Sequence, residues 1–245
     1  GLSPTRLDVI PENVEGMHVL RNLDDAIALR SDLRPGAKVV ILGSGFIGCE
    51  VASTAIKLGA EVTVISSSEL PLLRPLGREF ATELKHRLEA KGIKFLMNDG
   101  IKEVISTTEA YDSRIQSVRL KSDDVIDCDV LITAVGSSAN TEWLRESTID
   151  ISDGVLTNGA MQVLDNYGEK VSDVYAVGDV ARFPNPLFDE VPRRIEHWNI
   201  PTETARRVSK VIAAKENQDA NYSKILEEAF VPIPSFWSDQ FDMHI

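Results

Sequence analysis

The sequence predicts an α/β fold that opens with a parallel sheet, and three consecutive segments support this prediction. The run Lys38–Leu42 (KVVIL) is short, apolar and β-branched, as expected for a strand buried on both faces. Cys49–Leu58 follows with apolar residues at helical spacing, and Gly59 is placed to end that helix. Glu61–Ile65 (EVTVI) supplies a second strand. Strand, helix and strand in this order make a βαβ unit, whose two strands lie parallel.

The next segments extend this unit into a larger domain. Leu76–Lys91 predicts a second helix, because apolar residues recur every four positions and Gly92 follows. Further strands are expected at Ile93–Leu96, Ile101–Ser106, Arg114–Lys121, Asp123–Asp127 and Asp129–Val135. We interpret the middle three as an antiparallel meander inserted before the last parallel strand. These elements predict one complete domain over residues 21–137.

The second half of the chain has a different pattern. Val174–Val177 (VYAV) predicts a short strand that ends at Gly178 and Asp179. Pro201–Lys215 predicts a helix with proline in its first turn. Phe230–Ile245 is aromatic and interrupted by prolines, and it stops within a predicted strand. No internal repeat with a fixed period is present.

The segment between the first strand and the first helix, residues 43–48 (GSGFIG), has the spacing G-x-G-x-x-G. Its first glycine would make a tight turn, its second would let the backbone approach a pyrophosphate, and its third would let the helix pack closely on the strand. The positive end of the helix dipole would then favour phosphate. We interpret the loop as a dinucleotide-binding site, with a purely structural turn as the alternative. The binding residues expected here are Gly43, Gly45, Phe46, Ile47 and Gly48.

The choice between NADH and NADPH depends on the residue that follows the second strand. In NAD-preferring sites an acid stands there and binds the ribose hydroxyls, but this chain has Ser66. Serine does not repel a 2′-phosphate, which favours NADPH. No basic residue is adjacent, however, and the nearest is Arg74. The sequence therefore predicts an NAD(P)H site with weak discrimination, formed in part by Ser66 and Arg74.

Composition and charge exclude several classes of function. The formal net charge is −12, from 38 acidic and 26 basic residues, so nucleic acid and anionic membranes would repel the chain. No run of about 18 apolar residues predicts a membrane-spanning helix. The two cysteines, Cys49 and Cys128, are too few for a disulfide framework and predict a reducing compartment, with the cytoplasm as the expected location. The histidines lack ligand-like spacing, so no metal site is predicted.

Five segments in this order resemble one known family: GSGFIGCEVA, DVLITAVGSSANTEWL, VYAVGDVA, RRIEHWN and FWSDQFD. Together they resemble the pyridine-nucleotide-dependent FAD flavoprotein reductases, in particular the ferredoxin (putidaredoxin/rubredoxin) reductase branch. Apoptosis-inducing factors are similar relatives. The resemblance implies an α/β, two-Rossmann (FAD/NAD(P)-binding) fold with FAD and NAD(P)H as cofactors. In such a fold an NAD(P)H domain is inserted between two segments of an FAD domain, and an interface domain follows.

The resemblance also implies the domain boundaries. Residues 1–20 would end the first FAD segment and cross over, 21–137 would be the NAD(P)H-binding Rossmann-like domain, 138–228 the second FAD segment, and 229–245 the start of the interface domain. The first FAD motif and most of the interface domain are not in the sequence, so we expect an incomplete fold, an internal piece of a longer enzyme. Two positions depart from the family: Ser66 replaces the usual acid, and Ala139 replaces the proline usual before Asn140.

The flavin residues follow from the same resemblance. Gly178 and Asp179 match the second flavin motif, in which the aspartate hydrogen-bonds the ribityl chain of FAD. Val180 would lie beside the isoalloxazine. Trp237 would approach the flavin from the opening strand of the interface domain.

The nicotinamide end of the site is implied in the same way. Glu196, His197 and Trp198 match a segment that reaches both flavin and nicotinamide. Glu50 would contact the nicotinamide carboxamide, although a carboxylate in the first turn of a helix is also favoured by the helix dipole alone. Gly136 would line the dinucleotide site. Glu50 and Trp198 are the expected catalytic residues.

The activity implied by the resemblance is electron transfer from NAD(P)H through flavin to a ferredoxin-like iron–sulfur protein. Two alternatives stay open: a cysteine-dependent disulfide reductase or NADH oxidase, and an apoptosis-inducing-factor-like redox-gated binding protein. The expected partner is a ferredoxin-like electron carrier, with no nucleic acid and no membrane, and homodimerisation is left open. The doublets Arg193-Arg194 and Arg206-Arg207 are expected to be solvated or to meet an acidic carrier.

Overall fold

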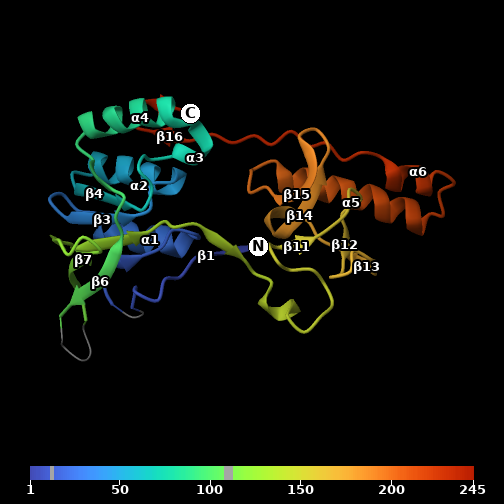
Figure 1. The fold of residues 1–245 in the computed structure, drawn as a ribbon, viewed down its shortest axis with the longest axis horizontal. Helices are drawn as coiled ribbons and strands as arrows, with labels where there is room; N and C mark the ends of the chain where they lie inside the picture. Colours follow the sequence, from blue (N-terminus) through green and yellow to red (C-terminus); the bar gives the residue numbers. More distant parts are fainter. Residues whose placement is uncertain (12–13, 108–112) are drawn as a thin grey trace. The chain divides into compact units, whose positions relative to one another are not determined.

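The computed structural model describes residues 1–11, 14–107 and 113–245, and these residues form two compact units (Figure 1). Unit 1 contains residues 1–3 and 137–236. Unit 2 contains residues 4–136 and 237–245. Within the described ranges, none of the helices has the length and apolarity needed to cross a membrane.

Unit 2 is built on a five-stranded parallel sheet with the strand order β2-β9-β3-β4-β5. The strands are β2 (Met17–His18), β3 (Lys38–Leu42), β4 (Glu61–Ser66), β5 (Lys94–Met97) and β9 (Val130–Thr133). The central strand β3 is buried at every position except its first. A strand with hydrogen-bonded neighbours on both sides and layers on both faces needs apolar residues throughout, and this confirms the interpretation of KVVIL.

Helices cover one face of this sheet: α1 (Leu23–Asp32), α2 (Phe46–Lys57), α3 (Leu73–Leu76) and α4 (Arg78–Ala90). Val39 and Ile41 of β3 point to this face and pack in one core cluster with Ala52, Leu84 and Leu88. The core therefore follows the two-residue period of the strand.

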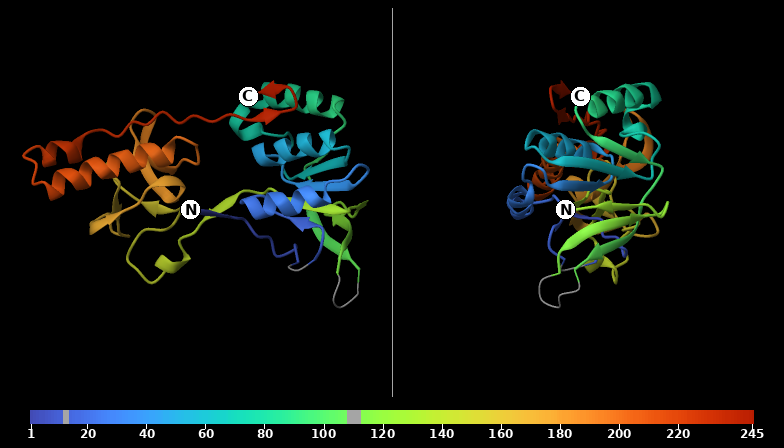
Figure 2. Two further views of the ribbon diagram at one scale, coloured as in Figure 1. Left: turned by 180° about the vertical axis from the view of Figure 1, so that it is seen from behind. Right: turned by 90° about the vertical axis from the view of Figure 1, so that its left-hand side faces the viewer.

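The other face of the sheet is covered by the predicted meander. It consists of β6 (Ile101–Ser106), β7 (Ile115–Leu120) and β8 (Val125–Asp127), paired antiparallel (Figure 2). Val40 and Leu42 of β3 pack on this side with Val118 and Leu120 of the meander. The meander predicted before the last parallel strand is confirmed. Residues 108–112, which fall between its first two strands, lie outside the described residues.

A short hairpin at the carboxyl end of the sequence also packs in unit 2. β16 (Asp239–Gln240) pairs antiparallel with β17 (Met243–His244), and Ser238 and Ile245 exchange two backbone hydrogen bonds of 2.9 Å. Phe241, Met243 and Ile245 pack against the core on the helical face.

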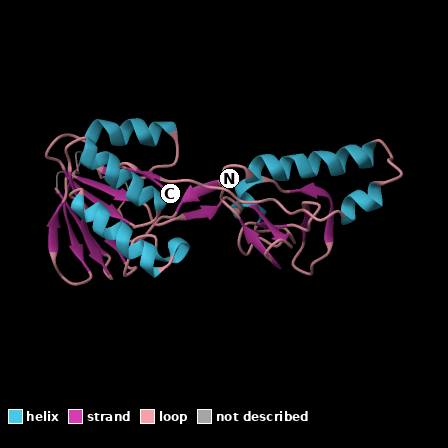
Figure 3. Cartoon of the chain, turned by 90° about the horizontal axis from the view of Figure 1, so that it is seen from above, coloured by secondary structure: helices cyan, strands magenta, loops and turns pink. Residues whose placement is uncertain are grey.

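Unit 1 contains small sheets and two helices. β1 (Leu2–Pro4) pairs with β10 (Ser137–Ala139), and the 3₁₀ helix η1 (Glu142–Leu144) follows. The other sheets are formed by β11 (Val155–Leu156), β14 (Ala181–Asn185) and β15 (Asp189–Arg194), and by β12 (Gln162–Leu164) and β13 (Lys170–Tyr175). A second 3₁₀ helix, η2 (Gly178–Val180), follows β13, and the two α-helices are α5 (Ile200–Glu216), drawn in cyan in Figure 3, and α6 (Tyr222–Glu227).

The predicted helix at 201–215 is confirmed as α5, with one more residue at each end. The core of unit 1 joins α5 to the sheets through Met161, Phe183, Ile200 and Phe230, and the two phenylalanine rings lie 5.4 Å apart. The strand predicted at 174–177 is β13, which begins and ends earlier because it pairs with β12.

Candidate functional site

Two of the loop glycines are required by their surroundings. Gly43 has a φ of +115°, and a Cβ there would lie 2.2 Å from the carbonyl oxygen of Ala134, just beyond β9. A Cβ on Gly48 would lie 2.1 Å from the carbonyl oxygen of Gly43. Real Cβ atoms do not approach backbone this closely, so any larger residue would separate the helix from the loop.

Gly45 differs from both. Its φ of −78° suits any L-residue, and a Cβ there would meet nothing within 4 Å. It is the N-cap of α2 and has no side chain that could cap the helix. The open space above Gly45 thus lies at the positive end of a 12-residue helix, which is the arrangement that binds a phosphate. Phe46 and Ile47 form the start of this helix, which begins three residues earlier than predicted.

Ser66 lies at the carboxyl end of β4 and is connected to the glycine-rich loop. The Ser44 hydroxyl donates to Ser66 Oγ over 2.9 Å, and the Ser68 amide donates to the same oxygen over 3.3 Å. Ser66 is only 8% exposed. A hydroxyl accepts two hydrogen bonds and donates one, so the Ser66 proton alone is left for a ligand.

The short helix α3 borders the same loop. The amide of Leu72, which precedes α3, donates to the carbonyl oxygen of Ser44 over 3.0 Å. Arg74 lies on α3 with its side chain exposed, and it has no ion-pair partner in the part of the chain that the structure describes. Arg78, one turn along, pairs with Glu69. Arg74 is therefore the uncompensated cation of this segment.

Because α2 begins at Phe46, Glu50 lies just beyond the first turn of the helix and not within it as expected, and its carboxylate contacts the carboxyl-terminal hairpin. The Ser238 hydroxyl donates to Glu50 Oε1 over 2.6 Å. Gln240 Nε2 donates to Ser238 Oγ over 3.1 Å. Trp237, which precedes the hairpin, is half-exposed.

Gly136 follows the last parallel strand with a φ of +97°, a value that favours glycine. A Cβ at this position would meet nothing within 4 Å. Unit 2 thus brings the glycine loop and Ser66 together at the carboxyl edge of the sheet, where open α/β sheets bind their ligands.

The expected flavin motif lies in unit 1, in η2, which packs beside α5. Gly178 has a φ of +73°, and its amide donates to Thr204 Oγ1 over 3.0 Å. Thr204 is fully buried on α5. The carbonyl oxygen of Asp179 accepts a 3.4 Å hydrogen bond from Arg194, which fixes the turn from its other side. Val180 completes η2 and is partly buried in the core of unit 1.

Glu196 belongs to a chain of charges in unit 1. Its carboxylate accepts from Arg194 over 2.7 Å and from the Ser137 hydroxyl over 3.1 Å. Arg194 also pairs with Asp153 at 2.7 Å. Both Glu196 oxygens are therefore used by the protein itself.

The two residues after Glu196 differ in exposure. His197 packs against the ring of Phe236 with centroids 5.2 Å apart, and its buried Nδ1 has no hydrogen-bond partner among the described residues. Burial lowers the pKa of His197 and outweighs the opposing charge of Glu196. Trp198 is 81% exposed.

Sequence reasoning missed the roles of Ser44, Ser238 and Thr204. It also expected Arg194 to be solvated or to meet an acidic carrier, which is wrong, because its largely buried side chain pairs with Asp153 and Glu196. Ser238 lies in the segment FWSDQFD, which carries part of the family resemblance, but it is 188 positions from Glu50, and no spacing rule connects residues so distant. Ser44 could have been found, because a hydroxyl inside a glycine loop has few partners except the end of the neighbouring strand.

The cysteines are not reactive thiols. Cys49 and Cys128 are both buried, and burial raises the pKa of each to about 12. Across residues 1–11, 14–107 and 113–245, no group of three or more His, Cys, Asp and Glu side chains could hold a metal ion.

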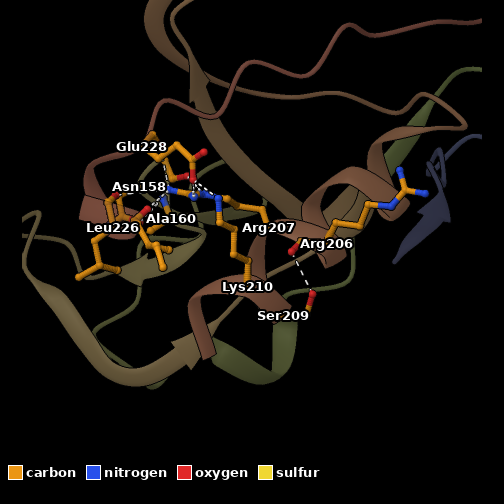
Figure 4. Close-up of polar contacts among 10 residues, drawn as sticks. Asn158, Ala160, Arg206, Arg207, Ser209, Lys210, Leu226 and Glu228 are labelled. Carbon is orange, nitrogen blue, oxygen red and sulfur yellow. Dashed lines mark hydrogen bonds and ion pairs between the residues drawn. The ribbon is translucent and has the colours of Figure 1, made fainter. Parts of the chain in front are cut away.

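The two arginines of the basic doublet on α5 have different surroundings (Figure 4). Arg206 is exposed and pairs with Glu203 at 2.7 Å. Arg207 is 6% exposed and donates to the carbonyl oxygens of Gly159, Ile225, Leu226 and Glu228. The expectation of a solvated doublet is wrong for Arg207, because its guanidinium satisfies backbone carbonyls that would otherwise be buried without donors.

The comparisons with known proteins agree that the similar proteins are oxidoreductases. The model of a family described as pyridine nucleotide-disulphide oxidoreductase matches residues 1–205. The chain is 32% identical over 193 residues to rubredoxin-NAD(+) reductase of Acinetobacter baylyi, covering 78% of this chain and 47% of that protein. It is 31% identical over 237 residues to rubredoxin-NAD(+) reductase of Ectopseudomonas oleovorans, covering 97% and 56%.

A solved structure matches along nearly the whole chain. The crystal structure of the covalent putidaredoxin reductase–putidaredoxin complex superposes with a TM-score of 0.82 at 25% identity, covering 99% of this chain and 54% of that one. The chain spans about half the length of the curated relatives it matches.

Proposed function

The chain belongs to the pyridine nucleotide-disulphide oxidoreductase family, and on this premise we propose that the whole protein passes electrons from NAD(P)H through FAD to a ferredoxin-like iron–sulfur protein. The observation that carries the proposal is the open approach to Gly45 at the start of α2. The relatives named as rubredoxin reductases and the neighbour solved with putidaredoxin support the choice of acceptor.

NAD(P)H would bind in unit 2, within residues 21–137. The loop glycines leave space for the pyrophosphate, and the α2 N-terminus supplies the favourable field. Ser66 and Arg74 would meet the ribose end, and Gly136 would line the site. Glu50 would bind the nicotinamide carboxamide through its carboxylate.

FAD would bind residues 138–228 together with a first FAD segment in the whole protein. The turn at Gly178 and Asp179 supports this assignment, since its positive φ suits glycine and the turn is hydrogen-bonded to Thr204 and Arg194. When bound there, FAD would supply the hydride-accepting and one-electron chemistry of the reaction. The protein's part is to bind and orient the two cofactors. Trp198 and Trp237 would border the ring system, and residues 229–245 would begin the interface domain.

The acceptor would be an acidic electron carrier, and its docking would use exposed cations. Arg193 and Arg206 are exposed, and each is paired with one neighbouring carboxylate at 2.7 Å or less. Such surface pairs hold their partners weakly and can exchange them. The chain's two cysteines give no support to a cysteine-dependent activity, because both are buried with raised pKa values. The cytoplasm is the proposed location.

The test is reduction of cytochrome c by NADH or NADPH in the presence of the whole flavin-loaded protein, with and without an added ferredoxin. We expect turnover that depends on the ferredoxin. Flavin reduction with no transfer to any ferredoxin or rubredoxin would contradict the proposed acceptor and favour the disulfide reductase or NADH oxidase alternative.

A further inference from the structure

The carboxyl-terminal hairpin reaches the residue expected at the nicotinamide. β16 lies beside α2 (Figures 1 and 2), and Ser238, just before β16, donates its proton to Glu50 Oε1 over 2.6 Å. Ser238 and Gln240 are both completely buried. These polar side chains are therefore enclosed in the packing between hairpin and helix, and Glu50 is the charged group they reach.

The direction of this hydrogen-bond chain is fixed by chemistry. Gln240 Nε2 can only donate, so the Ser238 oxygen accepts from it over 3.1 Å. An ionised carboxylate can only accept, so the Ser238 proton points to Glu50. Hydrogen bonds to a charged group are about twice as strong as neutral ones, so this one restrains the glutamate side chain.

The hairpin does not need Ser238 to stay in place. Lys57 donates to the carbonyl oxygen of Phe241 over 3.2 Å, and Lys91 pairs with Asp242 at 3.2 Å. Both ammonium groups also lie 5.7 Å from the centre of the Phe241 ring. Apolar contacts of Met243 and Ile245 with the core add to these. The hydroxyl of Ser238 is therefore not required to hold the hairpin against α2.

We propose that Ser238, supported by Gln240, is a positioning residue that aims the Glu50 carboxylate at the nicotinamide carboxamide. One carboxylate oxygen is occupied by the serine, which leaves the other to accept from the amide of the ligand. The inference rests on the proposed function, because it takes the nicotinamide end of the dinucleotide to lie at Glu50. It makes the segment after the flavin domain a part of the NAD(P)H site.

The test compares two ligands in purified Ser238→Ala protein by calorimetry. NAD⁺ carries the carboxamide, whereas ADP-ribose fills the same loop without it. We expect Ser238→Ala to raise the Kd of NAD⁺ between about three- and tenfold, the range that corresponds to the net contribution of one typical hydrogen bond, and to leave the Kd of ADP-ribose unchanged. The matched control is Thr54→Val, which removes a hydroxyl bonded over 3.0 Å to the Glu50 backbone carbonyl instead of its carboxylate. Its two Kd values should stay at the wild-type level.

A double-mutant cycle with Glu50→Ala separates the outcomes. If Ser238 acts through Glu50, adding Ser238→Ala to Glu50→Ala should change the Kd of NAD⁺ no further. An unchanged Kd of NAD⁺ in Ser238→Ala, or equal weakening of NAD⁺ and ADP-ribose, would overturn the inference even if stability falls. If Glu50→Ala itself leaves NAD⁺ binding unchanged, the proposed nicotinamide site is wrong and the inference fails with it.

Discussion

Replacing glycine by alanine should have different effects at two positions of the glycine loop. Gly48→Ala should lower the stability of unit 2, whereas Gly45→Ala should weaken the binding of NAD⁺. In Gly48→Ala the new Cβ would lie 2.1 Å from the Gly43 carbonyl oxygen, whereas ordinary contacts begin at 3.4 Å. Gly43 cannot retreat, because it is itself pressed against the backbone of Ala134. We expect overpacking to destabilise unit 2 by about 3 kcal/mol or more. This corresponds to a fall in Tm of about 6–12 °C.

Gly45→Ala should leave the fold intact. The Cβ enters open space at an allowed φ of −78°. Alanine is a poorer N-cap than glycine, so a loss below about 1 kcal/mol is expected. That Cβ stands, however, where the phosphates must approach the backbone, so the Kd of NAD⁺ should rise at least about tenfold, or 1.4 kcal/mol.

Scanning calorimetry for Tm and titration calorimetry for NAD⁺ binding measure both effects on the same two proteins. If Gly48 lets the helix pack on the loop and Gly45 faces the phosphates, Gly48→Ala must lower the Tm and Gly45→Ala must weaken NAD⁺ binding. Wild-type NAD⁺ affinity in Gly45→Ala, or a wild-type Tm in Gly48→Ala, would refute the reasoning.

Three further predictions concern other parts of the chain. The kcat/KM values for NADPH and NADH should differ by less than about a hundredfold (2.7 kcal/mol). Ser66→Glu should lower the activity with NADPH, because the new carboxylate repels the 2′-phosphate. Unchanged NADPH kinetics would mean that position 66 does not meet the ribose. Asp179→Ala in the whole protein should release flavin, measured as loss of its visible absorbance, and full flavin content would contradict the role of that carboxylate. Arg207→Lys should destabilise the protein by about 2–3 kcal/mol in denaturant unfolding, because an ammonium cannot reach the same set of carbonyls; Arg206→Lys is its exposed control and should change stability by less than about 0.5 kcal/mol.

The parts of the fold that could be predicted are those set by local pattern. KVVIL, the glycine loop and EVTVI each carry their own signal within a few residues, and the structure confirms the βαβ unit that they predicted. The two-Rossmann flavoprotein reductase fold was implied by the family resemblance of five segments, and the comparison with relatives confirms it. The start of α2 was placed too late, because Phe46 and Ile47 read as part of the loop while Gly45 is in fact the N-cap.

Elements with weak local signals were missed. Helix α1 was not predicted, since much of its surface is exposed and only its first turn marks it, through the reciprocal capping of Asn22 and Asp25. The carboxyl-terminal hairpin was read as part of a single strand. Its turn depends on Phe241 lying near Lys57 and Lys91, residues more than a hundred positions earlier in the sequence. Contacts at such separation have no signature in a single sequence.

The central claim, that this chain helps deliver electrons from a nicotinamide to a flavin, is tested most directly by an anaerobic titration. The whole flavin-loaded protein is mixed with NADH or NADPH, and the visible flavin absorbance is followed. We predict that the absorbance bleaches in proportion to the reduced nucleotide added, and that Glu50→Ala slows the bleaching without changing its end point. A flavin that stays oxidised while the nucleotide binds in unit 2 would contradict the claim.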